Sequence, residues 1–389
     1  MREPKLKYFI IVAMSLCAVM CRKPYEPAAI KASNHFLAAD GVINTAPYSP
    51  SRFILTRSLN LLDSATDLPE LGAEVLIQSA GGASFPLIDT GVNGIYVSAP
   101  LTLDPSQKYR LAITTVTGNK YLSDAVTPKT SPPIDSLNWQ LGVDANLATE
   151  ALHVFINSHD PTNNTRYYRW EYVETWQHAS PLETFWGLKN GLEYPIFPSE
   201  STHNCWQSGN STAILLGTSI TLSSDVISQA QIATFAKDDP KMDIEYSILV
   251  KQYPLDLEAF NYWLTVQKNS QSLGGLFDVQ PAQINGNIHG VTNPKDPVVG
   301  FVSACSIQEQ RMFISNKSLP GWKSNPTINC PIKLIASDPN NSLIWNYPDT
   351  SYQLYYFVSG PPPTLKITYK SCLDCRYFGG TNIKPPFWQ

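Results

Sequence analysis

The chain has 389 residues, a formal net charge of −4 and a pI near 5.9. This length suits two or three domains, each with a core large enough to fold alone. Only 15% of the residues are charged, against roughly a quarter in ordinary soluble domains, while Pro (31), Tyr (19) and Trp (9) are plentiful. This composition favours short strands and ordered loops. Because no block of Lys or Arg is present, nucleic acid is not an expected partner.

Residues 1–20 are typical of a secretory signal peptide. The basic side chains of Arg2, Lys5 and Lys7 precede an apolar stretch that runs to Met20. As a helix this stretch is too short to cross a bilayer, which takes about 20 apolar residues, and no second long apolar run follows. We therefore expect an exported protein without a transmembrane helix.

Cys21 ends the apolar stretch and begins a polar segment, which is where a bacterial lipoprotein carries its lipid-modified cysteine. Acyl chains there would anchor the protein at the outer membrane, with residues 21–35 as a tether. The alternative is an ordinary signal peptide whose cleavage leaves Cys21 free, because Met20 stands where a small residue is preferred. Of the two faces of the outer membrane, we expect the protein at the cell surface. Because a basic pair follows Cys21, the periplasmic face stays an open alternative.

The chain after the tether predicts an all-β protein with two domains. Short strands alternate with turn signals over residues 36–130, so we expect a β-sandwich of immunoglobulin or transthyretin type. The prolines of segment 126–133 cannot donate ladder hydrogen bonds, and they predict a junction. Residues 134–389 are expected to form a larger β-rich domain with a disulfide-bonded tail and one helix, for which Asp256 is a plausible N-cap.

One strand pattern within the second domain separates two faces. In Tyr168-Arg-Trp-Glu-Tyr172 the three aromatic side chains share one face, and Arg169 and Glu171 share the other. The sequence predicts that the aromatic face belongs to the core and that the charged face is wet.

The cysteines after Cys21 predict disulfides, which are the default in an oxidising compartment. Because five remain, at least one is unpaired. The pair Cys372 and Cys375 has the spacing of half a zinc site or of a redox dithiol, but it lacks a second close ligand pair and does not begin a helix. We expect Cys205 and Cys330 to pair with Cys372 and Cys375 in an order that stays open. Cys305 is expected to be free and buried.

The sequence contains no catalytic or metal-binding signature, and no cofactor is expected. A pair of catalytic carboxylates that come together only in the fold would not appear as a sequence motif, so such residues are considered separately. Those considered are expected on solvated strand faces or in turns, and the histidines lack metal-ligand spacing. We expect a protein that is not an enzyme. The carboxylates are Asp135, Asp160, Glu171 and Glu174.

Aromatic residues are dense between residues 167 and 206. Exposed Trp and Tyr rings present rigid area with a polar tip, so they suit a ligand or protein interface. The candidate binding residues are Trp176, Trp186, Tyr194 and Trp206. Core filling is the alternative, and it is favoured for the alternating strand positions.

A set of motifs runs through nearly the whole chain after the signal. They are Cys21-Arg-Lys-Pro-Tyr-Glu-Pro27, Ile134-Asp-Ser-Leu137, Tyr168-Arg-Trp-Glu-Tyr172, Tyr246-Ser-Ile-Leu-Val-Lys-Gln-Tyr253, Gly275-Leu-Phe-Asp-Val-Gln-Pro-Ala-Gln283, Gly286-Asn-Ile288, Val299-Gly-Phe301, Cys372-Leu-Asp-Cys-Arg376, Gly379-Gly-Thr-Asn382 and Pro385-Pro-Phe-Trp388. With them the chain resembles the Bacteroidetes lipoproteins grouped as domain of unknown function 4249. The closing Cys-x-x-Cys-Arg and Pro-x-Phe-Trp are the most specific part. Cys305 stands where the family usually has a small residue.

The resemblance implies a role by context, since the family has no assigned activity and hence no catalytic residues to carry over. Such lipoproteins are often encoded beside TonB-dependent outer-membrane transporters. The resemblance therefore implies a non-enzymatic binding accessory to a nutrient transporter. The alternative is a structural or adhesive envelope protein with immunoglobulin-like spacers, which would show a flat surface without a sizeable pocket.

Overall fold

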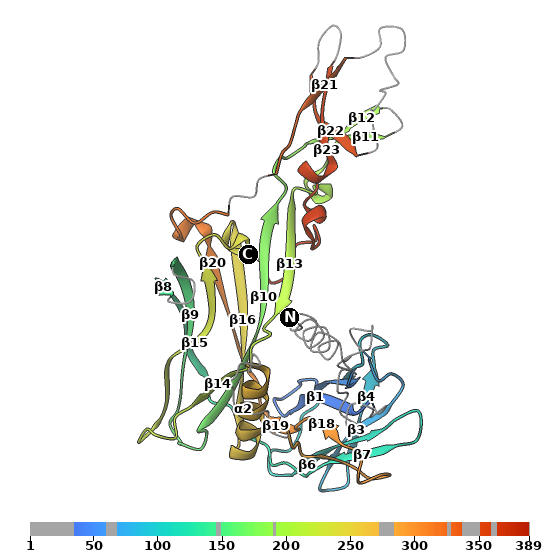
Figure 1. Cartoon of the computed structure of the whole chain (residues 1–389), viewed down its shortest axis with the longest axis vertical. Helices are drawn as coiled ribbons and strands as arrows, with labels where there is room; N and C mark the ends of the chain where they lie inside the picture. The colour runs from blue at the N-terminus through green and yellow to red at the C-terminus, as the bar shows by residue number, and fades with distance from the viewer. Residues whose placement is uncertain are drawn as a thin grey trace, which may run out of the picture.

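The computed structural model describes residues 35–59, 68–144, 149–189, 192–271, 284–324, 328–336, 351–358 and 364–388. The signal peptide and Cys21 lie outside these residues, so their assignments stay predictions. The described chain is elongated and mostly strand, with one α-helix, α2 (Leu257–Gln271) (Figure 1). The predicted all-β class is confirmed. No helix among the described residues is long and apolar enough to cross a membrane.

The N-terminal part of the chain contributes seven strands to a ten-stranded sheet that curls around its own core. The inward side chains include Phe53, Leu55, Ile77, Tyr96 and Leu111, each at most 1% exposed. The strands thus form one nearly closed, sandwich-like sheet around this core. In sheet order its strands are β17 (Ile288–Gly290), β7 (Lys120–Ser123), β6 (Tyr109–Thr114), β3 (Glu74–Ser79), β4 (Ser84–Asp89), β5 (Ile95–Ser98), β2 (Arg52–Arg57), β1 (Leu37–Asn44) and β18 (Val298–Val299), and β19 (Ser303–Cys305) also pairs with β1.

Three strands of this sheet come from chain that the sequence placed in the second domain. Strands β17, β18 and β19 lie within residues 288–305 and close the sheet against β7 and β1. Two glycines of the family motifs allow this approach. A Cβ on Gly300 would lie 2.3 Å from the carbonyl oxygen of Ala39, and one on Gly286 would lie 1.8 Å from that of Gly300. A boundary drawn in sequence order misses this return because it depends on pairing between distant segments.

The second unit is a sandwich of two sheets with a large shared core. Its inward side chains include Tyr168 and Trp170, so the predicted core face is confirmed. Tyr246, Ile248 and Val250 of the neighbouring strand join them in the core. One sheet has the order β15 (Asp225–Ala236), β9 (Thr149–Asp160), β8 (Ile134–Asp144), and the other has the order β13 (Asn204–Asn210), β10 (Tyr167–Ala179), β16 (Glu245–Leu255), β20 (Gln308–Ser315), with β14 (Leu215–Thr218) also on β10.

A third, smaller region forms the far end of the molecule from the N-terminal sheet (Figure 1). A two-stranded hairpin packs beside a three-stranded sheet whose core is Tyr352, Leu354, Leu365 and Ile367. We call this region the tip. Its strands are β11 (Trp186–Lys189) and β12 (Leu192–Pro195) in the hairpin, and β21 (Lys333–Ala336), β23 (Thr364–Tyr369) and β22 (Tyr352–Val358) in the sheet.

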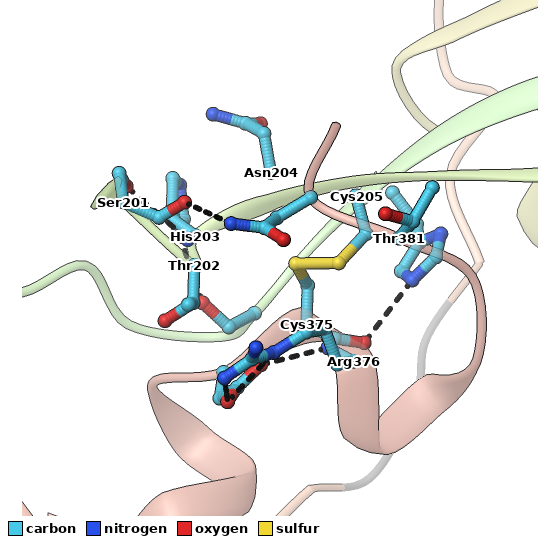
Figure 2. Close-up of a disulfide and its surroundings, with 12 residues drawn as sticks. Ser201, Thr202, His203, Asn204, Cys205, Cys375, Arg376 and Thr381 are labelled. Carbon is cyan, nitrogen blue, oxygen red and sulfur yellow. Dashed lines mark hydrogen bonds and ion pairs between the residues drawn. A yellow bond between two sulfur atoms is a disulfide. The ribbon is translucent and has the colours of Figure 1, made fainter. Parts of the chain in front are cut away.

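Two disulfides join the C-terminal tail to the body of the protein. Cys205 of β13 is bonded to Cys375, as Figure 2 shows, and Cys330 is bonded to Cys372. Cys305 is free and fully buried. The predicted pairing set and the free thiol are confirmed, and the order that the sequence left open is settled. The short 3-10 helices are η2 (Pro198–Glu200), η3 (Pro240–Met242), η4 (Asn316–Ser318), η5 (Lys370–Cys372) and η6 (Cys375–Phe378).

The proline-rich junction is held rigidly to the second unit by Gln252. The side-chain nitrogen of this fully buried residue donates to the Pro132 carbonyl at 2.9 Å and to the Ser158 hydroxyl at 3.1 Å. Its side-chain oxygen accepts from the Trp170 indole at 3.0 Å. Each of these buried polar groups therefore has a partner, which fixes the position of the junction.

Candidate functional site

A cleft with a volume of about 830 Å³ lies between the N-terminal sheet and the second unit. Its size is within the range of roughly 300–1,000 Å³ that is typical of small-molecule sites. The first wall is formed by the outward side chains of β1 and β2, which alternate with the buried residues of those strands. They include Asp40, Val42, Arg52 and Ile54.

The second wall is the outer face of the sheet that contains β10, β16 and β20. Strand register places two rows of side chains across this face. Arg169 lies opposite Tyr253, and one step further Glu171 lies opposite Lys251, which lies opposite Glu309. The Lys251 ammonium is 2.8 Å from the Glu309 carboxylate. Opposite charges on adjacent strands thus stabilise this wall.

Arg169 is the most constrained charge in the cleft. Its side chain is only 6% exposed, and its guanidinium carbon lies 4.0 Å from the centre of the Trp263 ring and 4.8 Å from that of Tyr253. One terminal nitrogen is 3.0 Å from a Glu171 oxygen. The Tyr253 hydroxyl donates to the other Glu171 oxygen at 2.9 Å. Two rings and one carboxylate therefore fix the plane of the guanidinium.

The Nε atom of Arg169 is buried and has no hydrogen-bond partner among the described residues. A buried donor without an acceptor is costly, at about 1–3 kcal/mol and more when it is charged. Arg169 also lines a second hollow of about 120 Å³, which opens beside Trp263 of α2 and the loop at residues 211–214. The residue that carries the unpartnered donor therefore lines both hollows.

Asp40 and Arg52 face this wall from the N-terminal sheet and form no ion pair with any described residue. Asp40 is exposed to the cleft, yet removal from bulk water by the surrounding protein raises the pKa of its carboxyl. The positive charge of Arg169 lowers that pKa, and Glu171 raises it. Because burial outweighs the nearby cations, the ionised Asp40 lacks full compensation in the protein alone.

An apolar cluster under the cleft joins the two units. Tyr253, Tyr262 and Phe301 are buried in it, and Val42 of β1 and Ile307 pack against it. Strand β16, helix α2 and the returning chain after β18 thus meet the N-terminal sheet at one place. The cleft is preformed because its floor is packed and because Gln252 fixes the junction.

The predicted wet face of β10 needs correction at Arg169. The alternation correctly placed Arg169 and Glu171 away from the core. The sequence did not indicate that helix α2 and the N-terminal sheet approach this face and bury the guanidinium. These residues are the part of the site that sequence reasoning missed. The one available signal was a pair of opposite charges flanked by aromatic residues in a single strand.

The four aromatic candidates do not converge on one site. Trp176 packs against the sandwich core, with the Lys241 ammonium 4.9 Å from its ring centre. Register places Trp206 on the opposite face, where it packs against Trp388 of the tail at 6.4 Å between ring centres. Both side chains therefore serve internal packing, which was the alternative to a binding role.

The other two aromatic candidates belong to the hairpin of the tip. Trp186 packs against the core of the tip, and its ring centre lies 6.1 Å from that of Phe357. Tyr194 is 41% exposed and covers Gly187, its partner across the hairpin. Tyr194 is thus the member of this pair that solvent or a partner reaches.

The carboxylates considered from the sequence lie in four different settings. Asp135 is 2.8 Å from the His159 ring at the surface, and Asp160 accepts bonds within its own turn. Glu174 was expected to be solvated but is buried, and it is bonded to the Lys241 ammonium at 2.7 Å. Only Glu171 lines the cleft. Within the described ranges, no three His, Cys, Asp or Glu side chains are grouped to hold a metal ion.

Residues 22–311 match the family described as domain of unknown function 4249. The chain belongs to this family. The matched DUF4249 region contains both walls of the cleft and ends at residue 311, before the Cys-x-x-Cys-Arg motif that was expected to be its most specific part. No curated protein matched the sequence.

Among solved structures, the chain is similar to a DUF4785 family protein from Legionella pneumophila subsp. pneumophila str. Philadelphia 1. The two are 9% identical with a TM-score of 0.18, and the match covers 56% of this chain and 52% of that one. The chain thus spans about half the length of that protein.

Proposed function

We propose that this DUF4249 protein is a non-enzymatic binding accessory to a TonB-dependent nutrient transporter in a bacterium of the Bacteroidetes. A lipid on Cys21 would hold it at the outer membrane, on the cell surface. The inter-domain cleft carries the proposal, because it is preformed, of ligand size and lined by charges that the protein does not fully pair. The transporter and the anchor rest on the family resemblance and on the N-terminal sequence.

The structural or adhesive alternative gives no reason for this cleft. Spacer domains need rigid packing, which the Gln252 network and the apolar cluster supply. They have no use for a buried guanidinium with an unpartnered donor at the edge of a recess. That donor costs stability, and a ligand anion beside the Arg169 guanidinium would offset part of the cost.

The tip offers the surface by which the protein would meet its partner. Phe185, Tyr194 and Phe197 are 61%, 41% and 64% exposed. Exposed aromatic side chains are frequent anchors of protein interfaces. The tip also lies at the end of the molecule farthest from the N-terminal sheet (Figure 1).

Affinity purification of the tagged protein from gently solubilised outer membranes tests the partner. We expect a TonB-dependent barrel in stoichiometric amount. The double variant Phe185→Ser with Phe197→Ser should recover at least several-fold less barrel. The matched control is Ile88→Ser, which changes a 70% exposed apolar residue on β4. Recovery of the protein alone, or of peptidoglycan-linked proteins, would overturn the accessory role.

The anchor is tested separately with Cys21→Ser. The wild-type protein should sediment with the outer membrane and carry the mass of two or three acyl chains. The variant should lose that mass and fractionate away from the membrane. Equal membrane association of both proteins would contradict lipidation at Cys21.

A further inference from the structure

We propose that the cleft binds an amino-acid-derived zwitterion, an α-amino acid or a short peptide with free termini. Its carboxylate would lie against Arg169 and its ammonium against Asp40. This inference rests on the proposed capture function and specifies its substrate class. It is carried by the placement of one incompletely paired cation and one unpaired anion on facing walls.

The carboxylate half follows from the state of Arg169. Guanidinium N–H groups lie in the plane of the group and match a carboxylate in a bidentate manner. Trp263 and Tyr253 lie against the guanidinium, and Glu171 takes one terminal nitrogen. The buried Nε has no partner among the described residues, so the protein itself does not fully satisfy this guanidinium. Arg52 lines the same cleft, has no ion-pair partner among the residues that the structure describes, and adds a second positive charge.

The ammonium half follows from Asp40. This carboxyl lines both hollows together with Arg169, so the two groups border the same space. It accepts no hydrogen bond from a described side chain, and its removal from bulk water by the surrounding protein raises its pKa. A ligand ammonium would favour its ionised form and offset the loss of water. In an α-amino acid the carboxylate and the ammonium are attached to the same carbon. This close spacing suits Arg169 and Asp40, which carry opposite charges and border the same space.

The charge balance of the cleft excludes other ligand classes. Three cations line it, Arg52, Arg169 and Lys251, and three carboxylates, Asp40, Glu171 and Glu309. A polyanion would meet repulsion from the carboxylates. A neutral sugar is usually held by open aromatic faces, whereas Tyr253 and Trp263 present their faces to Arg169. A ligand that carries both signs satisfies both sets of groups.

Binding of defined peptide pools to the purified Cys21→Ser protein tests the proposal. The first pool contains free α-amino acids and tripeptides with free termini, the second the same compounds N-acetylated, and the third the same compounds C-amidated. A pool of neutral mono- and disaccharides is the fourth. Captured molecules are identified by mass spectrometry and their affinities are measured by calorimetry. We expect enrichment from the first pool and an affinity loss of about tenfold or more on blocking either terminus.

The Asp40→Asn variant assigns the ammonium contact. It should bind free tripeptides about tenfold more weakly and should no longer distinguish them from the acetylated ones. Asp124→Asn is the matched control, because Asp124 directly follows β7 of the same sheet, is exposed and lies outside the cleft. The variant Arg169→Gln removes the carboxylate contact but also a packed ion pair. If Arg169→Gln fails to fold, Arg52→Gln provides a second test of the carboxylate contact, because Arg52 is exposed.

Three outcomes would refute the proposal of a zwitterionic ligand without refuting the capture function. Equal affinity for blocked and free peptides, or preference for the sugar pool, refutes the zwitterion and leaves capture intact. Absence of any bound amino acid or peptide from a folded protein that still recovers the barrel also refutes it. Absence of both ligand and barrel would refute the proposed function itself.

Discussion

Removal of the Cys205–Cys375 disulfide should cost more stability than removal of the other one. The two cysteines are separated by 170 residues, whereas Cys330 and Cys372 are separated by 42. Loop-closure entropy in the unfolded chain gives about 5 kcal/mol for the longer loop and about 4 kcal/mol for the shorter. The expected difference of about 1 kcal/mol depends only on the ratio of loop lengths, so it is firmer than either value.

Urea unfolding of the two double-serine variants measures this difference by tryptophan fluorescence. Cys205→Ser with Cys375→Ser is expected to lose more unfolding free energy than Cys330→Ser with Cys372→Ser. Each cysteine pair serves as the control for the other, because both disulfides join the same C-terminal tail and each double variant replaces two sulfur atoms with hydroxyl groups. Equal losses, or a larger loss from the short loop, would show that native-state packing of the tail outweighs the entropy of the unfolded chain.

Three further predictions concern single residues. Trp388→Ala should lower the unfolding free energy by about 3–5 kcal/mol, because the ring is 6% exposed and contacts Trp206 and Phe313; a loss below 1 kcal/mol in urea unfolding would contradict this. Cys305 should resist iodoacetamide until the protein is unfolded, since burial raises its pKa to about 12. Rapid labelling of Cys305 in the native protein, detected by mass spectrometry, would disprove this. The Asp40→Asn variant should have the same melting temperature as the wild type at about pH 3 and a higher one at about pH 7. Ionising a carboxyl with a raised pKa costs native-state stability, and the wild type bears this cost only as the pH rises. Equal melting temperatures of the two proteins at both pH values would oppose this.

Local patterns in the sequence predicted the local structure well. The prolines of segment 126–133 precede β8, which begins at Ile134 as expected. Asp256 accepts from the backbone N–H of Ala259 at 2.7 Å and so begins helix α2 as its cap. Each of these signals depends on a few neighbouring residues, which is why it can be seen in one sequence.

The cleft could not be predicted in the same way, because its parts are distant in the chain. Asp40 on β1 and Arg169 on β10 face each other only after residues 288–305 have returned to pair with the N-terminal sheet. Strand alternation placed Arg169 on the outer face of its sheet. It could not show what would cover that face. A charged residue on an outer strand face is usually solvated, and the tertiary contact overrides that expectation.

The outer face of the β13-β10-β16-β20 sheet is used in two ways, and this division explains why the tail is fastened so firmly. Toward one end the tail covers it: Trp388 packs on Trp206 and Phe313, and Phe387 lies 3.7 Å from the guanidinium carbon of Arg311. Toward the other end the same face becomes the cleft wall that begins at Glu309, two residues from Arg311 on β20. A loose tail would leave aromatic side chains exposed beside a charged ligand site. Bonding the tail at Cys375 keeps the apolar half of the face covered and leaves the polar half open to a ligand.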